Sequence, residues 1–293
     1  MKILEYDNGI VLTDIRHFGL RETLDNGSTF RWQCMNDNRY LGVVANKVIQ
    51  VMTLPDNRIF VDNVTMEEYA TYFRHYFDFN SDYDTIYKAL LNNETLNKLV
   101  PKTTPLRLLK QDFTESFVSA YISQNNNINR IKGIIYRLCE YCNNPLAYRD
   151  RTFYTFPTLE QLNNLTVNEF KFLGLGYRAE GIKKSIGELL NLENQKGNLN
   201  EYIKTLDYSD LYYYLVDFKG IGAKVANFII AMTGSCKNYM DAFVVDVWIK
   251  RAIQELFNIN TDNLEELDLL KEKVFKSYNA VAQQNIFYYY RNR

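Results

Sequence analysis

The chain has 293 residues, a formal net charge of −1, and 46% hydrophobic residues against 24% charged ones. This length and balance are ordinary for a folded globular protein, and they allow a substantial core and two domains. A nearly neutral chain is not a wholly basic nucleic-acid binder, although cations can still gather locally. Aromatic residues are frequent, with 23 Tyr and 18 Phe. Most of these rings are expected in cores, but ring faces also stack on extruded bases.

No run of eighteen apolar residues occurs, and no apolar stretch follows a basic start. We therefore predict neither a membrane span nor a secretion signal, and we expect a cytoplasmic location. The four cysteines do not resemble a disulfide framework. Cys139 and Cys142 form a lone C-x-x-C, for which a structural role is favoured over a zinc or redox role. His17 and His75 lie far apart in sequence, so a histidine-based triad or metal cluster is not expected.

Residues 9 to 62 predict strands. The stretches RYLGVVANKVIQVMTL and RIFVDNV are rich in Val, Ile and aromatic residues, and the turn signals DNG, NDN and PDN punctuate the region. After Thr65 the pattern changes, because TMEEYATYFRHYFDF opens with a capping threonine and an acidic pair and continues at helical spacing. Helical patterns then dominate to the end.

The sequence therefore predicts an α+β fold, with a small N-terminal antiparallel β domain followed by a larger all-α domain. The best boundary is PKTTP at 101–105. We expect a β-rich domain with flanking helices over 1–104 and a helical domain over 105–293. The stretch NNPLAYRDRTFYTFP at 143–157 is expected to be a loop that links two helices.

A local excess of cations occurs between residues 101 and 137. They outnumber the anions Asp112 and Glu115 by six to two. The pattern allows either a local basic face or ordinary solvated helix faces. The six cations are Lys102, Arg107, Lys110, Arg130, Lys132 and Arg137.

The stretch LVDFKGIGAKVANFII at 215–230 predicts two helices joined by a tight turn. Gly220 and Gly222 can adopt the positive φ angles that such a turn needs, and the apolar residues after them recur at helical spacing. The arrangement is a helix-hairpin-helix at about 211–232. Amides near the N-terminus of its second helix can bind a phosphate without reading sequence.

Two charged residues stand out in and after this motif. Lys224 follows the turn by two residues, where a cation opposes the positive end of the helix dipole. Asp246 lies between Val245 and Val247, and a carboxylate there is costly unless it is hydrogen-bonded, caps a helix or is used. Lys224 is either a solvated first-turn residue or an amine nucleophile, and Asp246 is either a plain N-cap or its acidic partner.

The segments FKGIGAKVANFI and FVVDVW resemble the helix-hairpin-helix DNA glycosylase superfamily. Four further blocks, in order and spacing, are similar to the 8-oxoguanine DNA glycosylase/lyase family: NGSTFRW at 26–32, LLKQDFTESFVSAYISQNNNINRI at 108–131, LGLGYRAEGI at 173–182 and AVAQQNIF at 280–287. The blocks span nearly the whole chain.

The resemblance implies a bifunctional DNA repair glycosylase and AP lyase. Such an enzyme flips 8-oxoguanine out of duplex DNA, excises it through a lysine Schiff base, and needs no metal or organic cofactor. The expected partner is double-stranded DNA containing oxidised guanine, with no membrane, and the expected state is a monomer. The location would be cytoplasmic, at the nucleoid if the source is prokaryotic.

The resemblance also assigns residues to the reaction. Lys224 would attack C1′, and Asp246 would stabilise the developing sugar cation and shuttle protons. The carbonyl of Gly27 would accept the N7 hydrogen of the oxidised base. The residues implied at the flipped base are Gly27, Phe228, Gln283 and Phe287.

A second set is implied on the DNA. Amide and guanidinium groups suit the orphaned cytosine because they make multi-point hydrogen bonds to base edges. Two plainer interpretations stay open: SQNNNINR as a polar helix start with an Asn cap, and GLGYRAEG as a glycine-rich turn with a solvated arginine. The DNA-contacting residues implied are Asn125, Asn126, Arg130, Tyr177, Arg178, Gly220, Gly222 and Trp248.

Three positions depart from the family pattern. Val244 replaces a usual proline, Trp248 a frequent histidine, and Phe228 a cysteine found in some relatives. These changes favour a bacterial or archaeal branch and leave fine base selectivity open. One alternative is a monofunctional glycosylase for alkylated bases, which would need no lysine nucleophile. The other is a non-catalytic helix-hairpin-helix module. The iron–sulfur branch is not favoured, because no cysteine follows Asp246.

Overall fold

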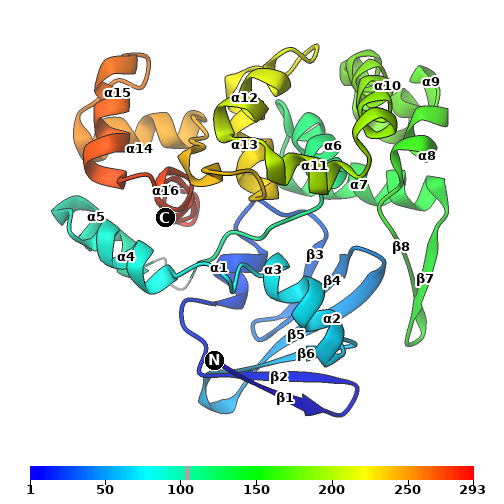
Figure 1. Ribbon diagram of the computed structural model, residues 1–293, viewed down its shortest axis with the longest axis horizontal. Helices are drawn as coiled ribbons and strands as arrows, with labels where there is room; N and C mark the ends of the chain where they lie inside the picture. The colour runs from blue at the N-terminus through cyan, green and yellow to red at the C-terminus, as the bar shows by residue number, and fades with distance from the viewer. Residues whose placement is uncertain (103–105) are drawn as a thin grey trace.

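The computed structural model describes residues 1–102 and 106–293. Its smaller part is a six-stranded antiparallel sheet (Figure 1). The predicted β-rich N-terminal region is confirmed, and it extends to the first residues of the chain. In spatial order the strands are β1 (Lys2–Tyr6), β2 (Gly9–Thr13), β6 (Arg58–Asp62), β5 (Lys47–Leu54), β4 (Arg39–Val44) and β3 (Trp32–Asn36).

The two faces of the sheet bury different residues, because side chains alternate along each strand. In β5, Ile49 and Val51 belong to the main core of this domain, whereas Val48 points to the opposite face. The main core is covered by α1 (Leu20–Leu24) and by a helical run that comprises α2 (Met66–Glu68), a π-helical turn and α3 (Arg74–Tyr76). Thr65 and Glu68 form the capping box that begins this run, so the predicted threonine cap is confirmed.

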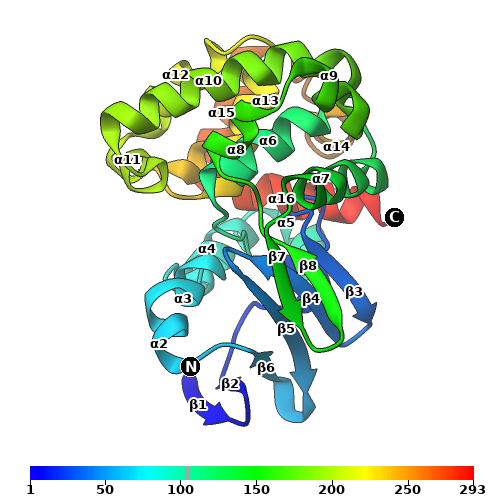
Figure 2. The ribbon, with the colours of Figure 1, turned by 90° about the vertical axis from the view of Figure 1, so that its right-hand side faces the viewer.

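The larger part of the molecule is helical and has its own core (Figures 1 and 2). Its helices are α4 (Tyr83–Leu91), α5 (Glu94–Leu99), α6 (Phe113–Ser123), α7 (Ile128–Cys142), α8 (Leu159–Asn164), α9 (Val167–Phe170), α10 (Ala179–Lys196), α11 (Leu199–Thr205), α12 (Tyr208–Val216), α13 (Ala223–Thr233), α14 (Val247–Phe257), α15 (Leu264–Leu270) and α16 (Asn279–Arg291). None of the helices within the described ranges has the length and apolar character of a membrane span.

The chain first enters the helical part before the predicted boundary. Residues 103–105 of PKTTP lie outside the described ranges. Helices α4 and α5 precede that point but pack into the core of the helical part, next to α16. The domain limits 1–104 and 105–293 therefore stay a prediction.

Residues 143–157 are not the loop that the sequence analysis expects. They contain a β-hairpin, β7 (Pro145–Tyr148) and β8 (Arg151–Tyr154), which extends from the helical part along the sheet (Figure 2). Its apolar side chains pack against the second face of the sheet, and the hydroxyl of Tyr148 donates to Asp62 at 2.6 Å. The expectation failed because each strand has only four residues and gains its stability from the sheet that it covers.

The excess of cations at 101–137 allows either a basic face or ordinary solvated helix faces. Four of the six cations have their head groups bound to other groups of the protein, although Arg137 among them is exposed. Lys110 pairs at 3.1 Å with Asp78, whose side chain is fully buried, and Arg137 donates to the carbonyl of Leu173. Lys132 binds Asp25, and Arg107 binds three carbonyls. A count of charges does not reveal such internal partners.

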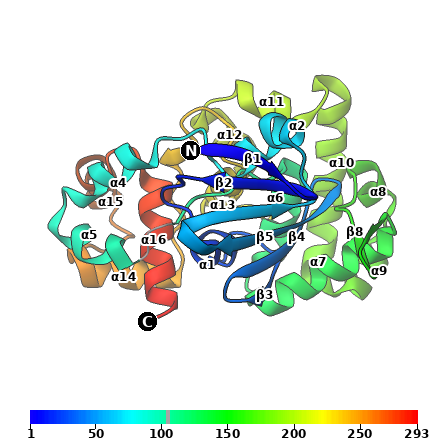
Figure 3. The ribbon, with the colours of Figure 1, turned by 90° about the horizontal axis from the view of Figure 1, so that it is seen from below.

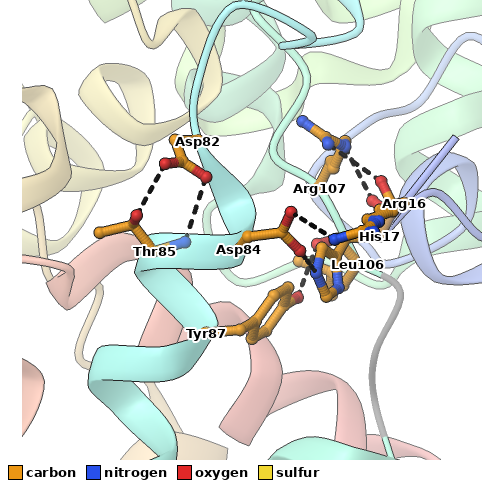
Figure 4. Close-up of polar contacts among 8 residues, drawn as sticks. All are labelled: Arg16, His17, Asp82, Asp84, Thr85, Tyr87, Leu106 and Arg107. Atoms are coloured by element: carbon orange, nitrogen blue, oxygen red, sulfur yellow. Dashed lines mark hydrogen bonds and ion pairs between the residues drawn. The ribbon is translucent and has the colours of Figure 1, made fainter. Parts of the chain in front are cut away.

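Arg107 ties the crossing segment to the N-terminal part (Figure 4). Its guanidinium is buried and stacks on Tyr83, with Cζ 4.3 Å from the ring centroid. It donates to the carbonyls of His17 at 2.8 Å, Asp78 at 2.7 Å and Arg16 at 3.0 Å. One side chain thereby satisfies three main-chain acceptors from two separate segments.

We predict that Arg107→Leu lowers the free energy of unfolding by about 3 kcal/mol, because it leaves buried carbonyls without donors. The control is Arg16→Leu. Within residues 1–102 and 106–293 the side chain of Arg16 makes only an exposed ion pair with Asp84, so its loss should cost less than about 1 kcal/mol. Urea denaturation of both variants measures the difference. Equal losses would contradict the role of Arg107 at this junction.

Candidate functional site

A cavity of about 150 Å³ lies where the two parts of the molecule meet. It is lined by the turn after α1, the segment before α6, the end of α6 with the start of α7, helix α13, the segment that leads into α14, and helix α16. The predicted site residues that line it are Gly27, Asn126, Lys224, Phe228, Asp246, Gln283 and Phe287. A larger cavity of about 590 Å³, between α7 and the β7–β8 hairpin, contains none of the predicted site residues.

The helix-hairpin-helix is formed by α12, a turn over residues 217–222, and α13, as the sequence predicts. Gly220 has the expected positive φ of 85°, but Gly222 has φ −98°, so the expectation of positive φ is wrong for Gly222. Gly222 instead begins α13 without a side-chain cap, and a Cβ there would meet nothing within 4 Å. The first amides of α13 are therefore left without side-chain cover.

Tyr121 of α6 fixes this turn from beneath. Its hydroxyl donates to the carbonyl of Lys219 at 2.7 Å. Gly181 and Gly220 make room for it, because a Cβ at these positions would lie 2.0 Å and 2.8 Å from the hydroxyl oxygen. Tyr121 has no sequence signal as a site residue, since nothing in the sequence links α6 to the hairpin.

Lys224 occupies the second position of α13 and is exposed at the cavity. Phe228 lies one turn further along the same face. The ring of Phe228 packs edge-on against that of Phe30, with centroids 6.4 Å apart. A primary amine and an aromatic wall thus face the same space.

Asp246 is the N-cap of α14, and its Oδ1 accepts the amide of Ile249 at 2.8 Å. The N-cap interpretation is confirmed, yet the same carboxylate also lines the cavity with Lys224. The two interpretations are compatible, because a carboxylate has two oxygens and the cap bond uses one. The positive end of α14 also favours a negative charge at this position.

Asn227 connects the helix of Lys224 to the segment that leads to Asp246. Its Oδ1 accepts the amide of Phe243 at 3.0 Å and the hydroxyl of Tyr208 at 2.9 Å. Burial raises the pKa of Tyr208 to about 12, so its hydroxyl remains a donor at neutral pH. Asn227 was not among the predicted site residues. The lone amide within the mostly apolar stretch AKVANFII is nevertheless a sequence signal for a buried hydrogen-bonding residue.

Gly27 lies in the turn between α1 and β3 and has φ 89°. A Cβ there would stand 2.6 Å from Nη1 of Arg291 and 3.1 Å from Cε1 of Phe287. The backbone conformation disfavours a side chain, and a Cβ would force the guanidinium of Arg291 to move. Gly27 therefore completes the DNG turn and also places its main chain against the wall formed by Phe287.

The segment between α6 and α7 places one predicted DNA-contacting residue, Asn126, at the cavity. Asn127 caps α7 by accepting the amide of Arg130 at 3.0 Å, so the polar helix start is confirmed. Asn126 lines the cavity, Arg130 is exposed, and Asn125 has a positive φ of 45°.

Arg178 differs from the solvated arginine that the plainer interpretation of GLGYRAEG requires. It is 5% exposed and donates to the carbonyls of Gln124 and Asn125. Tyr177 beside it is 71% exposed, and the guanidinium of Arg178 lies 4.4 Å from its ring centroid. Trp248 is also exposed, two residues after Asp246.

The C-x-x-C pair lies in α7, away from this cavity. Cys139 is buried and accepts a hydrogen bond from Arg31 at 2.8 Å. Burial raises the pKa of Cys139 to about 12, which keeps its thiol protonated. Among residues 1–102 and 106–293, no three His, Cys, Asp or Glu side chains are grouped to hold a metal.

Comparison with known proteins gives matches along most of the chain. The model of the 8-oxoguanine DNA glycosylase N-terminal domain matches residues 10–117, and that of the HhH-GPD superfamily of base excision DNA repair proteins matches residues 118–276. A crystal structure of the Clostridium acetobutylicum 8-oxoguanine glycosylase/lyase, in complex with dsDNA containing cytosine opposite 8-oxoG, is 31% identical with a TM-score of 0.91. The match covers 100% of this chain and 98% of that one.

Curated sequences give shorter matches. An N-glycosylase/DNA lyase of Saccharomyces cerevisiae is 31% identical over 199 residues, which are 63% of this chain and 52% of that protein. A probable N-glycosylase/DNA lyase of Methanothermobacter thermautotrophicus is 27% identical over 203 residues, or 61% of each. The matched part therefore spans between about half and three fifths of these curated relatives.

We predict that Gly27→Ala destabilises the protein more than Gly197→Ala. Gly197 is the matched control, because it has a similar φ of 80° but nothing within 4 Å of a new Cβ. The backbone conformation alone should cost about 1 kcal/mol at Gly197. Displacing Arg291 and Phe287 should add at least about 1 kcal/mol at Gly27. Urea denaturation tests this, and equal losses would show that crowding at Gly27 is negligible.

Proposed function

This chain belongs to the HhH-GPD superfamily of base excision DNA repair proteins and to its 8-oxoguanine glycosylase/lyase family, and we propose that it is a bifunctional DNA glycosylase and AP lyase. Its substrate would be 8-oxoguanine in double-stranded DNA. One observation carries the proposal: Lys224 and Asp246 line one cavity with Gly27, Gln283 and Phe287. The cavity thus combines an amine, a carboxylate, an aromatic face and base-reading groups.

The reaction begins when the damaged nucleotide leaves the helix, because C1′ is inaccessible inside a duplex. The amine of Lys224 loses a proton and attacks C1′. The bond from C1′ to N9 breaks, and the base leaves with a proton. Opening of the sugar ring then gives an imine between Lys224 and C1′, and elimination of the 3′ phosphate cleaves the strand.

Asp246 would act on the charge that develops at the sugar. Its cap bond to Ile249 fixes the carboxylate before the substrate arrives, and such preorganisation is what makes electrostatic stabilisation effective. Its position in the same cavity as Lys224 also lets it accept the proton that the amine must lose before attack.

Recognition of the lesion would depend on Gly27. Gln283 would read the Watson–Crick edge, which is the same in guanine and 8-oxoguanine. The two bases differ at N7, which is an acceptor in guanine and an N–H donor in 8-oxoguanine. A main-chain carbonyl can only accept, so the Gly27 carbonyl would bind the oxidised base and face a lone pair in the normal one. Phe287 would stack on the flipped base, with Phe228 as another wall.

The remaining predicted residues would hold the DNA. Asn125 and Arg130 would face the orphaned cytosine, and the exposed ring of Tyr177 would fill the gap beside it. Arg178 would face the cytosine only after its guanidinium leaves the carbonyls of Gln124 and Asn125. The amides of the Gly220–Gly222 turn and the indole of Trp248 would contact the backbone.

An alkylated-base glycosylase and a non-catalytic DNA-binding module remain the competing functions. Neither needs an amine and a carboxylate that line the same cavity. The monomeric state and the cytoplasmic or nucleoid location stay predictions.

We predict that Lys224→Gln abolishes covalent trapping by borohydride on a duplex containing 8-oxoguanine, while duplex binding persists. Borohydride reduces the imine, and glutamine cannot form one. The control is Lys219→Gln, which removes an exposed cation from the same turn and should leave trapping intact. Denaturing electrophoresis of the cross-linked product is the measurement. Full trapping by Lys224→Gln would remove Lys224 from the mechanism.

We predict that Asp246→Asn lowers the single-turnover excision rate by about 100-fold or more. Asparagine still caps a helix, so this variant removes the charge and keeps the bond to Ile249. Asp82→Asn is the matched control, because Asp82 caps α4 in the same way, through the amide of Thr85. Its excision rate should equal that of wild type. An unchanged rate in Asp246→Asn would leave the carboxylate with a capping role alone.

A further inference from the structure

The turn Asp25–Ser28, here called the base-reading loop, carries a regular pattern of acceptors. Three of its four carbonyls accept hydrogen bonds from buried or half-buried side chains elsewhere in the chain. These bonds are Arg291 Nη2 to Asp25 at 2.8 Å, Gln284 Nε2 to Asn26 at 3.0 Å, and Gln111 Nε2 to Ser28 at 2.9 Å. Within the described ranges no donor reaches the carbonyl of Gly27, the fourth of the loop.

The loop is also held from within. The side chain of Asn26 is fully buried, and its Oδ1 accepts both the amide of Ser28 at 2.9 Å and the hydroxyl of Ser28 at 2.7 Å. The bond from the Ser28 amide fixes the Gly27–Ser28 peptide group, which carries the Gly27 carbonyl, and the bond from Gln284 fixes the Asn26–Gly27 peptide group. The loop therefore cannot reorient its free carbonyl without breaking buried hydrogen bonds, which is costly.

Two of the external donors come from one helix, α16, which also carries Gln283 and Phe287. Gln284 is 6% exposed, and Nη1 of Arg291 lies 2.6 Å from the position that a Cβ of Gly27 would take. That Nη1 is buried and has no hydrogen-bond partner in the described part of the chain. A buried N–H group without a partner costs free energy. This cost is explained if the position of the guanidinium beside Gly27 is itself required.

We propose that Gln284 and Arg291 are positioning residues for lesion discrimination. They satisfy the carbonyls before Gly27 and hold the loop against α16, so that Gly27 presents the loop's one free acceptor to the flipped base. This inference rests on the proposed glycosylase function and adds residues to it. Their effect is on the selection of oxidised guanine and not on the chemistry at C1′.

The lyase step on an abasic site separates this role from simple packing. An abasic substrate has no base to read, but it still forms the imine with Lys224. Gln284→Met and Arg291→Met keep side-chain length and remove the donors. Each should slow excision of 8-oxoguanine by about tenfold in single turnover, while trapping on an abasic duplex stays within about twofold of wild type.

The second measurement compares 8-oxoguanine with 8-oxo-7-deazaguanine, which lacks the N7 donor. Wild type should excise 8-oxoguanine faster than the deaza analogue. Both variants should lower the ratio of these two excision rates, because the Gly27 carbonyl is no longer held in place. Arg293→Met is the matched control. Arg293 lies two residues beyond Arg291 and pairs with Glu255 on the surface. The Arg293→Met variant should therefore show the same ratio of excision rates as wild type.

Parallel losses on the 8-oxoguanine and abasic duplexes would overturn the proposal, because they indicate general loss of structure. Unchanged excision and an unchanged ratio would also overturn it. Selective loss with a narrowed ratio supports it. Failure of the proposed function is a distinct result, since the wild type itself would then neither excise 8-oxoguanine nor be trapped on the abasic duplex.

Discussion

The hydrogen bond from Gln284 to the carbonyl of Asn26 joins positions 258 residues apart, and the candidate site depends on that junction. The N-terminal part contributes Gly27 and Phe30 to the cavity, and the helical part contributes the amine, the carboxylate and the stacking ring. Neither part contains a complete site. The buried guanidinium of Arg107 and the β7–β8 hairpin hold the two parts together at other points, so the cavity is a consequence of how the parts dock (Figures 2 and 4).

Helix starts place the polar groups around the cavity. Lys224 stands in the first turn of α13, Asp246 caps α14, and Asn126 precedes α7. Seen from below, the sheet lies in front of α13, and α16 runs beside the sheet (Figure 3). The first amides of α13 have no side-chain cap, and the partial positive charge of a helix N-terminus favours a phosphate backbone. The same geometry that fixes the reacting groups therefore suits an anionic duplex, even though the whole chain has a net charge of −1.

Short-range sequence patterns predicted individual strands, helices and caps. They did not predict contacts between residues that are far apart in the sequence. The strands, the Thr65 cap and the helix-hairpin-helix follow from short-range spacing, and the family blocks led to the residues that gather at the cavity. The hairpin at 145–154 was missed, because its strands are short and depend on the sheet they cover. The burial of Arg107 and Arg178 was missed for a related reason. The sequence does not indicate which distant carbonyls will accept hydrogen bonds from an arginine side chain.

A carbonyl held in place has an advantage over a side chain as the reader of N7. An asparagine or glutamine amide presents an oxygen or an NH₂ group after a simple rotation, so it could bind the N–H of 8-oxoguanine or the lone pair of guanine. A peptide carbonyl whose neighbouring residues are held by hydrogen bonds cannot exchange its oxygen for a donor by rotation. Gly27 suits this role because its φ of 89° and the crowding by Arg291 and Phe287 disfavour a side chain there. Under the proposed function, discrimination against the vast excess of normal guanine would follow from the rigidity of this carbonyl, and the donors on α16 would supply that rigidity.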